Sequence, residues 1–280
     1  MVLFNSIKKF SPEWALVVSF TLYYAIIGSK QPPFLREFLI NDPTIQHPFT
    51  QFETIDDKKC ILISSLVPLV LICLVTLGKH NWKFNKIINN NKFFNFLHLS
   101  ILGLALSLSI TGFITFFLKN MIARPRPDFI DRCKPDLLKI KPNKFLYSID
   151  ICTNDNYELI LEGLRSTPSG HASIAFSGLH YVTLFLFAQL SVWSNRKRIH
   201  LLLLSVLPEF IALFIALSRT QDYRHHFGDI FMGTLIGVGI SYITYRKIFP
   251  SFADENYQDV YYLKEHSEIL PLYQERERSV

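Results

Sequence analysis

The segment SRTQDYRHHFGD, residues 218–229, places two arginines, two histidines and two aspartates between two apolar stretches. Arg219 precedes His225 by six residues, and His225 precedes Asp229 by four. Residues four apart share a face of a helix, so we expect the Asp229 carboxylate to reach the His225 ring. An imidazole can attack phosphorus, and a neighbouring carboxylate fixes its tautomer and stabilises the positive charge that develops. This spacing predicts a site that binds and attacks a phosphate.

A second polar segment, KNMIARPRP, supplies more positive charge. Lys119 opens it, and Arg126 follows seven residues later. Together with Arg219 these side chains offer fixed cations, and a guanidinium fork matches the oxygens of a phosphate. Taken singly, such residues at the end of an apolar stretch are more often interfacial anchors. It is their occurrence beside the other polar segments that indicates an anion site.

The third polar segment is PSGH, which begins an apolar stretch at residue 168. Ser169 is suited to cap a helix, and Gly170 lets the backbone come close to a ligand, so free N–H groups can bind an anion there. His171 is then left to protonate the departing oxygen. One histidine as nucleophile and one as acid and then base are what transfer through a phosphohistidine requires.

The elements that must position these residues are membrane helices. The chain has 280 residues, is 49% hydrophobic and has a mean hydropathy of +0.22, which is too apolar for a soluble domain of this length. Its apolar stretches approach the ~20 residues that span a bilayer. They lie at roughly 14–28, 60–78, 93–118, 172–193, 199–217 and 229–245. We predict an all-α, polytopic membrane protein: a bundle of six transmembrane helices in residues 1–250, then a mobile, acidic cytoplasmic tail at 251–280.

The net charge of +6 is explained by membrane orientation rather than by nucleic-acid binding, because the basic residues form no stripe with stacking aromatics. They concentrate in alternate connections, which the positive-inside rule places in the cytoplasm. These residues are Lys8, Lys9, Lys79, Lys83, Lys86, Lys92, Arg196, Lys197, Arg198, Arg246 and Lys247. The connections 29–59, 119–171 and 218–228 then lie on the other side. All three polar segments therefore meet at one non-cytoplasmic membrane edge.

The four cysteines have no zinc-site spacing. Cys133 and Cys152 share the long non-cytoplasmic connection, where an oxidising lumen permits a bridge, so we predict a disulfide between them. Cys60 and Cys73 are expected to be membrane-buried apolar residues.

Three other ionisable residues have a structural interpretation. Glu209, beside Pro208 in the fifth apolar stretch, lies ten residues from Arg219, about 15 Å along a helix, and is too deep for the same site. We expect it to be protonated or paired across the bundle. His98 is expected to be a packed polar residue, and His226 to neighbour the nucleophile in sequence only.

The three segments resemble the signature of the phosphatidic acid phosphatase type 2 superfamily, in the form Lys-x6-Arg-Pro, Pro-Ser-Gly-His and Ser-Arg-x5-His-x3-Asp. All three spacings match without a gap. NDPTIQHPF, RPDFIDRC and ALSRTQDYRHHF are similar to segments of the fungal lipid phosphatases in that superfamily, and the similarity covers most of residues 30–250.

The resemblance implies a six-span lipid phosphatase that needs neither magnesium nor another cofactor. Its substrate would be a phospholipid held in the bilayer: diacylglycerol pyrophosphate, which loses its terminal phosphate, and then phosphatidate. By position, phosphate would be bound by Lys119, Arg126, Ser169, Gly170 and Arg219, with His171 as acid and the pair His225 and Asp229 as nucleophile. We expect a multi-pass protein of the endomembrane system with a luminal site, and the vacuole, the Golgi apparatus and the endoplasmic reticulum all stay open.

Other functions stay open at this point. The superfamily also contains phosphatases for lysophosphatidate, sphingoid-base phosphates and isoprenoid diphosphates. A transporter or scaffold with a non-catalytic pocket is a second class, although this chain has both a nucleophile and an acid. A soluble vanadium-type haloperoxidase is opposed by the apolar stretches. A metal site of His171, His225 and Asp229 is opposed by the three nearby cations, which would repel a divalent ion.

Overall fold

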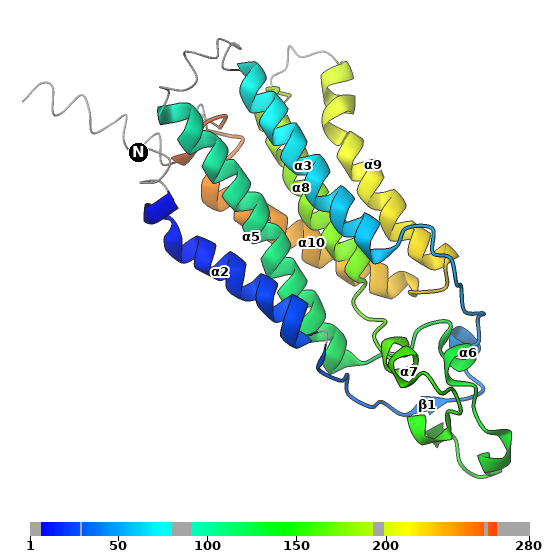
Figure 1. Cartoon of the computed structure of the whole chain (residues 1–280). Helices are drawn as coiled ribbons and strands as arrows, with labels where there is room; N and C mark the ends of the chain where they lie inside the picture. Colours follow the sequence, from blue (N-terminus) through cyan, green and yellow to red (C-terminus); the bar gives the residue numbers. More distant parts are fainter. Residues whose placement is uncertain (1–6, 29, 80–90, 193–198, 255–256, 262–280) are drawn as a thin grey trace, which may run out of the picture.

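A computed structural model describes residues 7–28, 30–79, 91–192, 199–254 and 257–261 (Figure 1). Long helices form a bundle, and short elements form a layer across one of its ends. The long helices are α2 (Ser11–Leu22), α3 (Asp57–Lys79), α5 (Asn91–Ile122), α8 (Gly170–Gln189), α9 (Ile199–Gln221) and α10 (Phe227–Ile248). A π-helical segment, Tyr23–Gly28, continues α2. Successive helices run in opposite directions, as the predicted order of spans requires.

The prediction of an all-α, multi-pass membrane protein is confirmed. Among the described residues, five helices are long and apolar enough to cross a membrane, namely α3, α5, α8, α9 and α10. The predicted span 14–28 corresponds to α2 and its π-helical continuation, an apolar helix at Ser11–Ile27 that is shorter than the other five. The count of six spans therefore stays a prediction.

Helix α8 occupies the centre of the bundle and is buried along most of its length (Figure 1). Glycines let its neighbours come close. A Cβ atom on Gly178 would lie 1.8 Å from the Ser64 carbonyl oxygen of α3, and one on Gly237 of α10 would lie 2.4 Å from the Ser173 carbonyl oxygen. Contacts between small residues of this kind are how membrane helices pack without a hydrophobic driving force between them. They hold the first half of α8 close to α3 and α10.

The layer is built from the connections 30–56 and 123–169, and we call these two segments the extramembrane layer. It contains the strand pair β1 (Phe38–Leu39) and β2 (Leu146–Tyr147), the helices α6 (Phe129–Cys133) and α7 (Tyr157–Gly163), and three 3₁₀ turns (Pro43–Ile45, Leu137–Lys139 and Ile149–Ile151). Its own apolar core includes Phe38, Phe129, Tyr147 and Leu164.

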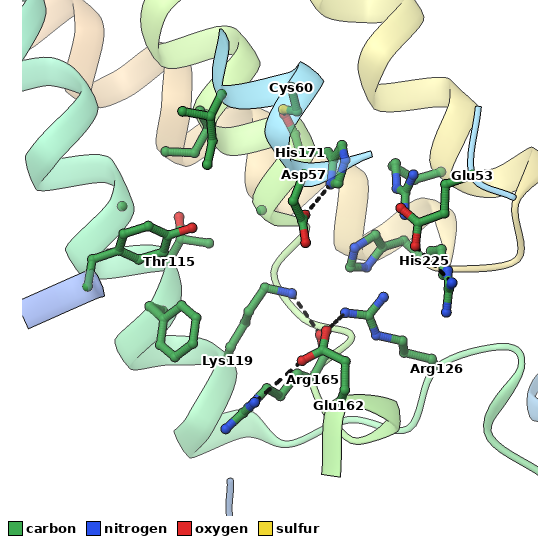
Figure 2. Close-up of a pocket in the computed structure, with 18 of the residues that line it drawn as sticks. Glu53, Asp57, Cys60, Thr115, Lys119, Arg126, Glu162, Arg165, His171 and His225 are labelled. Carbon is green, nitrogen blue, oxygen red and sulfur yellow. Dashed lines mark hydrogen bonds and ion pairs between the residues drawn. The ribbon is translucent and has the colours of Figure 1, made fainter. Parts of the chain in front are cut away.

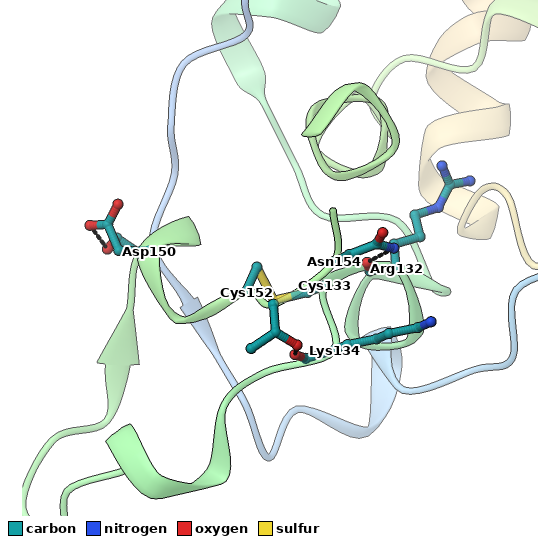
Figure 3. The surroundings of a disulfide bond; sticks show 8 residues. Arg132, Cys133, Lys134, Asp150, Cys152 and Asn154 are labelled. Atoms are coloured by element: carbon teal, nitrogen blue, oxygen red, sulfur yellow. Dashed lines mark hydrogen bonds between the residues drawn. A yellow bond between two sulfur atoms is a disulfide. The ribbon is translucent and has the colours of Figure 1, made fainter. Parts of the chain in front are cut away.

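A disulfide joins Cys133 and Cys152 across the layer, so that prediction is confirmed (Figure 3). Cys133 is fully buried in the layer core. The bridge closes a loop of sequence separation 19, and Thr153 and Asn154 donate hydrogen bonds to backbone oxygens beside it. Cys60 and Cys73 are free, and Cys60 is buried in the bundle as expected, whereas Cys73 is only partly buried.

The opposite end of the bundle carries Lys79 and the beginning of the predicted tail. The Lys79 ammonium donates to the Gln258 side chain at 2.7 Å, and Val260 is buried against the bundle. Much of the predicted tail, 255–256 and 262–280, lies outside the described residues, as do the basic connections 80–90 and 193–198.

Candidate active site

A cavity of about 300 Å³ opens where the bundle meets the extramembrane layer (Figure 2). Side chains from α3, α5, α8 and α9 form one part of its wall, and the layer forms the other. Six of the eight predicted site residues line it: Lys119, Arg126, Gly170, His171, Arg219 and His225. Ser169 and Asp229 are fully buried beside it. The structure thus brings together three segments that are spread over residues 119–229 of the sequence.

Ser169 caps α8, which begins at Gly170 as the sequence predicted. Its Oγ accepts a hydrogen bond from the Ala172 N–H at 3.4 Å. Its own N–H donates to the Asp229 carbonyl oxygen at 2.9 Å, which ties the start of α8 to the first turn of α10. The N-terminus of α8 therefore faces the cavity, where its free N–H groups and dipole favour an anion.

His225 and Asp229 are close, but they do not share a helical face as expected. Helix α10 begins at Phe227, so His225 precedes it, and its Nδ1 lies 4.0 Å from Asp229 Oδ2. Asp229 turns back instead to cap the helix, because its Oδ2 accepts the His226 N–H at 3.0 Å and lies 3.1 Å from the His226 ring. His226 is thus a structural partner of Asp229 and more than a neighbour in sequence.

Asp229 also holds the layer onto the bundle. Its two oxygens accept hydrogen bonds from the hydroxyls of Ser166, at 2.6 Å, and Thr167. Arg124 adds an ion pair at 3.0 Å. Because so many donors converge on a fully buried carboxylate, its position relative to His225 is fixed by the segment that leads into PSGH.

The two nitrogens of His171 have different surroundings. Nε2 lies 3.0 Å from the Ile55 carbonyl oxygen, which can only accept, so this nitrogen carries the hydrogen in the neutral ring. Nδ1 lies 3.6 Å from the Asp57 carboxylate. Nδ1 is therefore the atom that can gain and lose a proton, and Asp57 supplies a carboxylate near it.

Acidic side chains and carbonyl oxygens hold the predicted cations in place. Lys119 Nζ donates to the Arg165 carbonyl oxygen at 2.7 Å. Arg126 pairs with Glu162 of α7. Arg219 pairs with Glu53 and with Asp222, each at 3.0 Å. Such pairs fix the direction in which each guanidinium presents its remaining N–H groups.

The environment of His225 favours a neutral ring. Burial lowers the pKa of His225 well below the ordinary value of 6.5, and the cations of Lys119, Arg126 and Arg219 lower it further. Its Nδ1 is buried and has no hydrogen-bond partner among the described residues. A neutral imidazole keeps the lone pair that a nucleophile needs.

Sequence reasoning missed the acids of this site. Burial raises the pKa of Glu162, but Arg126, Lys119 and Arg165 together lower it below the ordinary value. Glu53, Asp57 and Glu162 all line the cavity, yet they belong to connections without regular spacing. The one available signal was that these acids lie in the connections 29–59 and 119–171, which the distribution of lysines had already placed on the same side as the predicted cations.

The remaining ionisable residues have the structural partners that were expected. Glu209 of α9 lies 2.5 Å from His180 Nδ1 of α8, so it is paired across the bundle. His98 is buried, and its Nε2 accepts a hydrogen bond from the Trp14 indole at 2.9 Å. Neither residue lines the cavity.

Comparisons with known proteins agree with this geometry. The model of the PAP2 superfamily matches residues 100–253, which contain all three segments. The chain belongs to the PAP2 superfamily. It is 38% identical over 241 residues, 85% of this chain and 78% of the relative, to diacylglycerol pyrophosphate phosphatase 1 of Saccharomyces cerevisiae. The family predicted from the three motifs is thereby confirmed.

Two further relatives are similar over comparable lengths. The identity is 34% over 253 residues, 90% of this chain and 85% of the relative, with the probable diacylglycerol pyrophosphate phosphatase 1 of Schizosaccharomyces pombe. It is 32% over 240 residues, 85% of this chain and 77% of the relative, with lipid phosphate phosphatase 2 of Arabidopsis thaliana. No solved structure matches the chain. Membership makes this protein a hydrolase of phosphate esters with membrane helices.

Proposed function

We propose that this PAP2 enzyme is a lipid phosphatase that removes the terminal phosphate of diacylglycerol pyrophosphate and the phosphate of phosphatidate through a phosphohistidine at His225. The names of the relatives from both yeasts support the first substrate, and the name of the Arabidopsis relative supports a wider set of lipid phosphates. The proposal assigns no step to a metal or a cofactor.

The observation that carries a lipid substrate is a second, apolar cavity of about 270 Å³ between α2, α3, α5 and α8. It shares Tyr24, Ile61, Gly112 and Ile174 with the wall of the charged cavity. The two spaces therefore adjoin, one cationic and one apolar. A phosphate in the first can remain attached to an acyl chain in the second, which a small soluble phosphate ester would not require.

The chemistry takes two steps. With Nδ1 facing Asp229, His225 Nε2 attacks the terminal phosphorus, the bond from phosphorus to the leaving oxygen breaks, and His171 Nδ1 gives that oxygen a proton. His171 then takes a proton from water, whose oxygen attacks the phosphohistidine. The phosphorus–nitrogen bond breaks, inorganic phosphate leaves, and His225 is regenerated.

The cations act on the charge that the phosphoryl group carries. Lys119, Arg126 and Arg219 are buried, with exposed fractions of 8%, 7% and 1%, so water screens them little. Held in place by acids and carbonyl oxygens, they can stabilise the transition state without reorganising. The 4.0 Å separation between His225 Nδ1 and Asp229 Oδ2 is compatible with Asp229 orienting the His225 ring, because catalytic hydrogen bonds often tighten only in the complex with substrate.

The proposed site faces the lumen of an endomembrane compartment. The lysine and arginine distribution supports this side, and so does the disulfide in the layer, since such bridges persist in oxidising compartments. The test of sidedness is labelling of single cysteines in oriented vesicles. A cysteine at position 90 and one at position 140 should be protected oppositely, and equal accessibility would contradict the topology.

The function is tested with purified protein in detergent, assayed for phosphate release from diacylglycerol pyrophosphate, phosphatidate, lysophosphatidate, a sphingoid-base phosphate and an isoprenoid diphosphate, each with EDTA. We expect release from the first two lipids and an acid-labile, base-stable phosphoenzyme after rapid quenching. Activity that disappears in EDTA and returns with a divalent metal would overturn the proposal.

A further inference from the structure

Three arginines around the cavity share one feature: a buried Nε–H without a hydrogen-bond partner among the described residues. They are Arg126, Arg219 and Arg224, with exposed fractions of 7%, 1% and 6%. A buried donor left unpaired is destabilising, so such groups are uncommon unless a ligand satisfies them. Arg126 and Arg219 belong to the superfamily signature. Arg224 falls among its unspecified positions.

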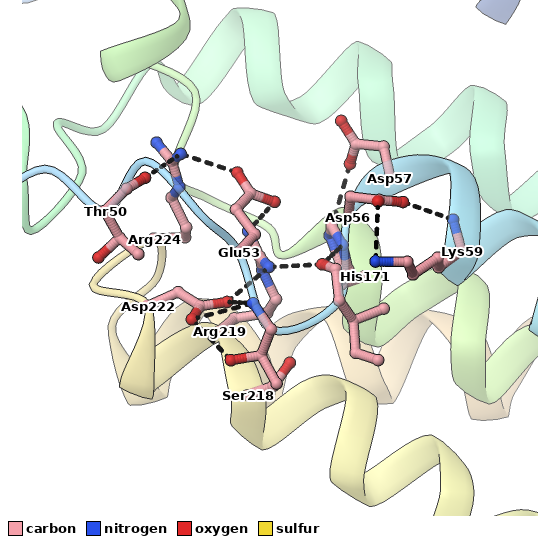
Figure 4. A network of polar contacts seen from close by, with 12 residues as sticks. Thr50, Glu53, Asp56, Asp57, Lys59, His171, Ser218, Arg219, Asp222 and Arg224 are labelled. Carbon is pink, nitrogen blue, oxygen red and sulfur yellow. Dashed lines mark hydrogen bonds and ion pairs between the residues drawn. The ribbon is translucent and has the colours of Figure 1, made fainter.

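Arg224 is held in the same way as Arg219, by the same acid (Figure 4). One oxygen of Glu53 lies 3.0 Å from Arg219, and the other lies 2.8 Å from Arg224. Arg224 also pairs with Asp128 at 3.1 Å and donates to the Thr50 carbonyl oxygen at 3.0 Å. Both terminal nitrogens therefore have partners, and Nε is the one nitrogen of Arg224 that has none among the described residues. The guanidinium is further fixed over the Phe49 ring, at 4.5 Å from its centroid.

The neighbouring Arg132 shows what a purely structural arginine looks like here. It shares Asp128 and the Phe49 ring with Arg224, and it also borders the cavity. Its Nε, however, donates to Asp128 Oδ1 at 2.8 Å, and its terminal nitrogens donate to Asp128 and to the Leu159 carbonyl oxygen. Every nitrogen of Arg132 therefore has a protein partner, whereas Nε of Arg224 has none among the described residues.

We propose that Arg224 is a third arginine that binds the transferred phosphoryl group, donating Nε–H to one of its oxygens alongside Arg126 and Arg219. Glu53 acts as a positioning residue that orients Arg219 and Arg224 toward the same group. This inference rests on the proposed phosphatase function.

The chemistry of the transition state explains why a third donor is useful. A phosphoryl group in transfer carries charge on three equatorial oxygens, while the attacking and leaving atoms lie in line. Arg224 directly precedes the nucleophile His225 in the chain, and both residues line the cavity, so Arg224 borders the space in which the phosphoryl group would be transferred. Three buried guanidinium groups can then each meet one equatorial oxygen.

The test compares Arg224→Lys with Arg132→Lys. Both keep the positive charge, and both remove the planar fork and the Nε–H. For Arg224→Lys we expect kcat with phosphatidate to fall at least tenfold and inhibition by orthovanadate, a mimic of the five-coordinate transition state, to weaken by a similar factor. For Arg132→Lys we expect a lower Tm, with turnover and vanadate inhibition per folded molecule close to those of the wild type.

The outcomes separate the two proposals. A wild-type protein that releases no phosphate from any lipid would overturn the proposed function. An active wild type with Arg224→Lys and Arg132→Lys alike in vanadate inhibition would overturn only the role of Arg224. If Arg224→Lys does not fold, a structure of the wild type with bound vanadate decides: Arg224 Nε within hydrogen-bond distance of a vanadate oxygen supports the inference, and Arg224 apart from it refutes it.

Discussion

The bundle and the extramembrane layer contribute different things to the same cavity. Helix ends of the bundle supply Lys119, His171 and Arg219, which hold charge or move protons. The layer supplies Arg126 but also Glu53 and Glu162, acids that direct the cations, and it has its own core and disulfide. This contrast suggests that changes at helix ends remove chemistry, whereas changes in the layer loosen the geometry on which the chemistry depends.

The largest effect is expected at the nucleophile. His225→Ala should lower turnover by about 10⁴-fold or more and leave no phosphoenzyme, because no other group can take its place. Rapid-quench measurement of phosphate release and of protein-bound phosphate checks both. His47→Ala is the control, since His47 is a layer histidine that stacks on Tyr223, 4.4 Å away, outside the cavity wall. Wild-type turnover in His225→Ala would disprove the mechanism.

The general acid should have a smaller effect than the nucleophile. His171→Gln keeps a donor toward the Ile55 carbonyl oxygen but cannot protonate the leaving oxygen, so we expect turnover to fall by about 10²–10⁴-fold. The defect should shrink with a substrate whose leaving group has a low pKa, such as an aryl phosphate, because that group needs no proton. An equal defect with both substrates would contradict the assignment.

Removing the disulfide tests the stability of the layer separately from that of the bundle. Replacing Cys133 and Cys152 by serine should destabilise the layer by about 3 kcal/mol in the chain-entropy model. Faster hydrogen exchange in residues 126–163, with unchanged exchange in α8 and α9, is the expected result. Cys73→Ser, which removes a free thiol of α3, should leave exchange in the layer as it is. Global unfolding of the double variant would show that the layer is no separate unit.

These differences explain which features of the fold and of the site could be predicted from the sequence. The helices, the three segments and the disulfide were predictable because apolar length, fixed motif spacing and cysteine placement are local signals. The roles of Glu53 and Glu162 were not predictable, since each depends on a contact with a distant cation. The relation of His225 to Asp229 was misjudged because Asp229 caps α10 and helix periodicity begins only after His225.

A substitution at the junction between the charged and apolar cavities should change the preference for acyl-chain length more than the rate of the chemical step. A Cβ atom on Gly112 would lie 3.8 Å from Ile174 and 3.9 Å from Tyr24, so Gly112→Leu extends into the junction. Displacing two chain methylenes costs about 1.6 kcal/mol, slightly more than tenfold in kcat/KM. Long-chain phosphatidate should show this loss, while a dihexanoyl analogue should not. Gly78→Leu, at the other end of α3 with no atom near, is the control.

The smallest expected effect is on the pH dependence of stability and activity that His225 causes. Because burial and nearby cations lower the pKa of His225, the folded protein keeps this ring neutral below 6.5, where an unfolded chain would protonate it. The folded state then binds fewer protons, so stability falls as the pH drops below 6.5. The acid limb of kcat/KM that reports His225 lies below that value for the same reason.

Removing a cation near His225 should move the acid limb of kcat/KM to higher pH. In Lys119→Gln the folded site repels the imidazolium less, so the pKa of His225 rises toward its ordinary value and the limb moves to higher pH. The substrate phosphate ionises identically in both assays, so the difference between the two pH profiles isolates the enzyme. Lys139→Gln, an exposed change in the layer, should leave the profile unchanged. A limb that moved to lower pH in Lys119→Gln would mean that a different group titrates there, and that burial and charge around His225 do not set the acid limit of this enzyme.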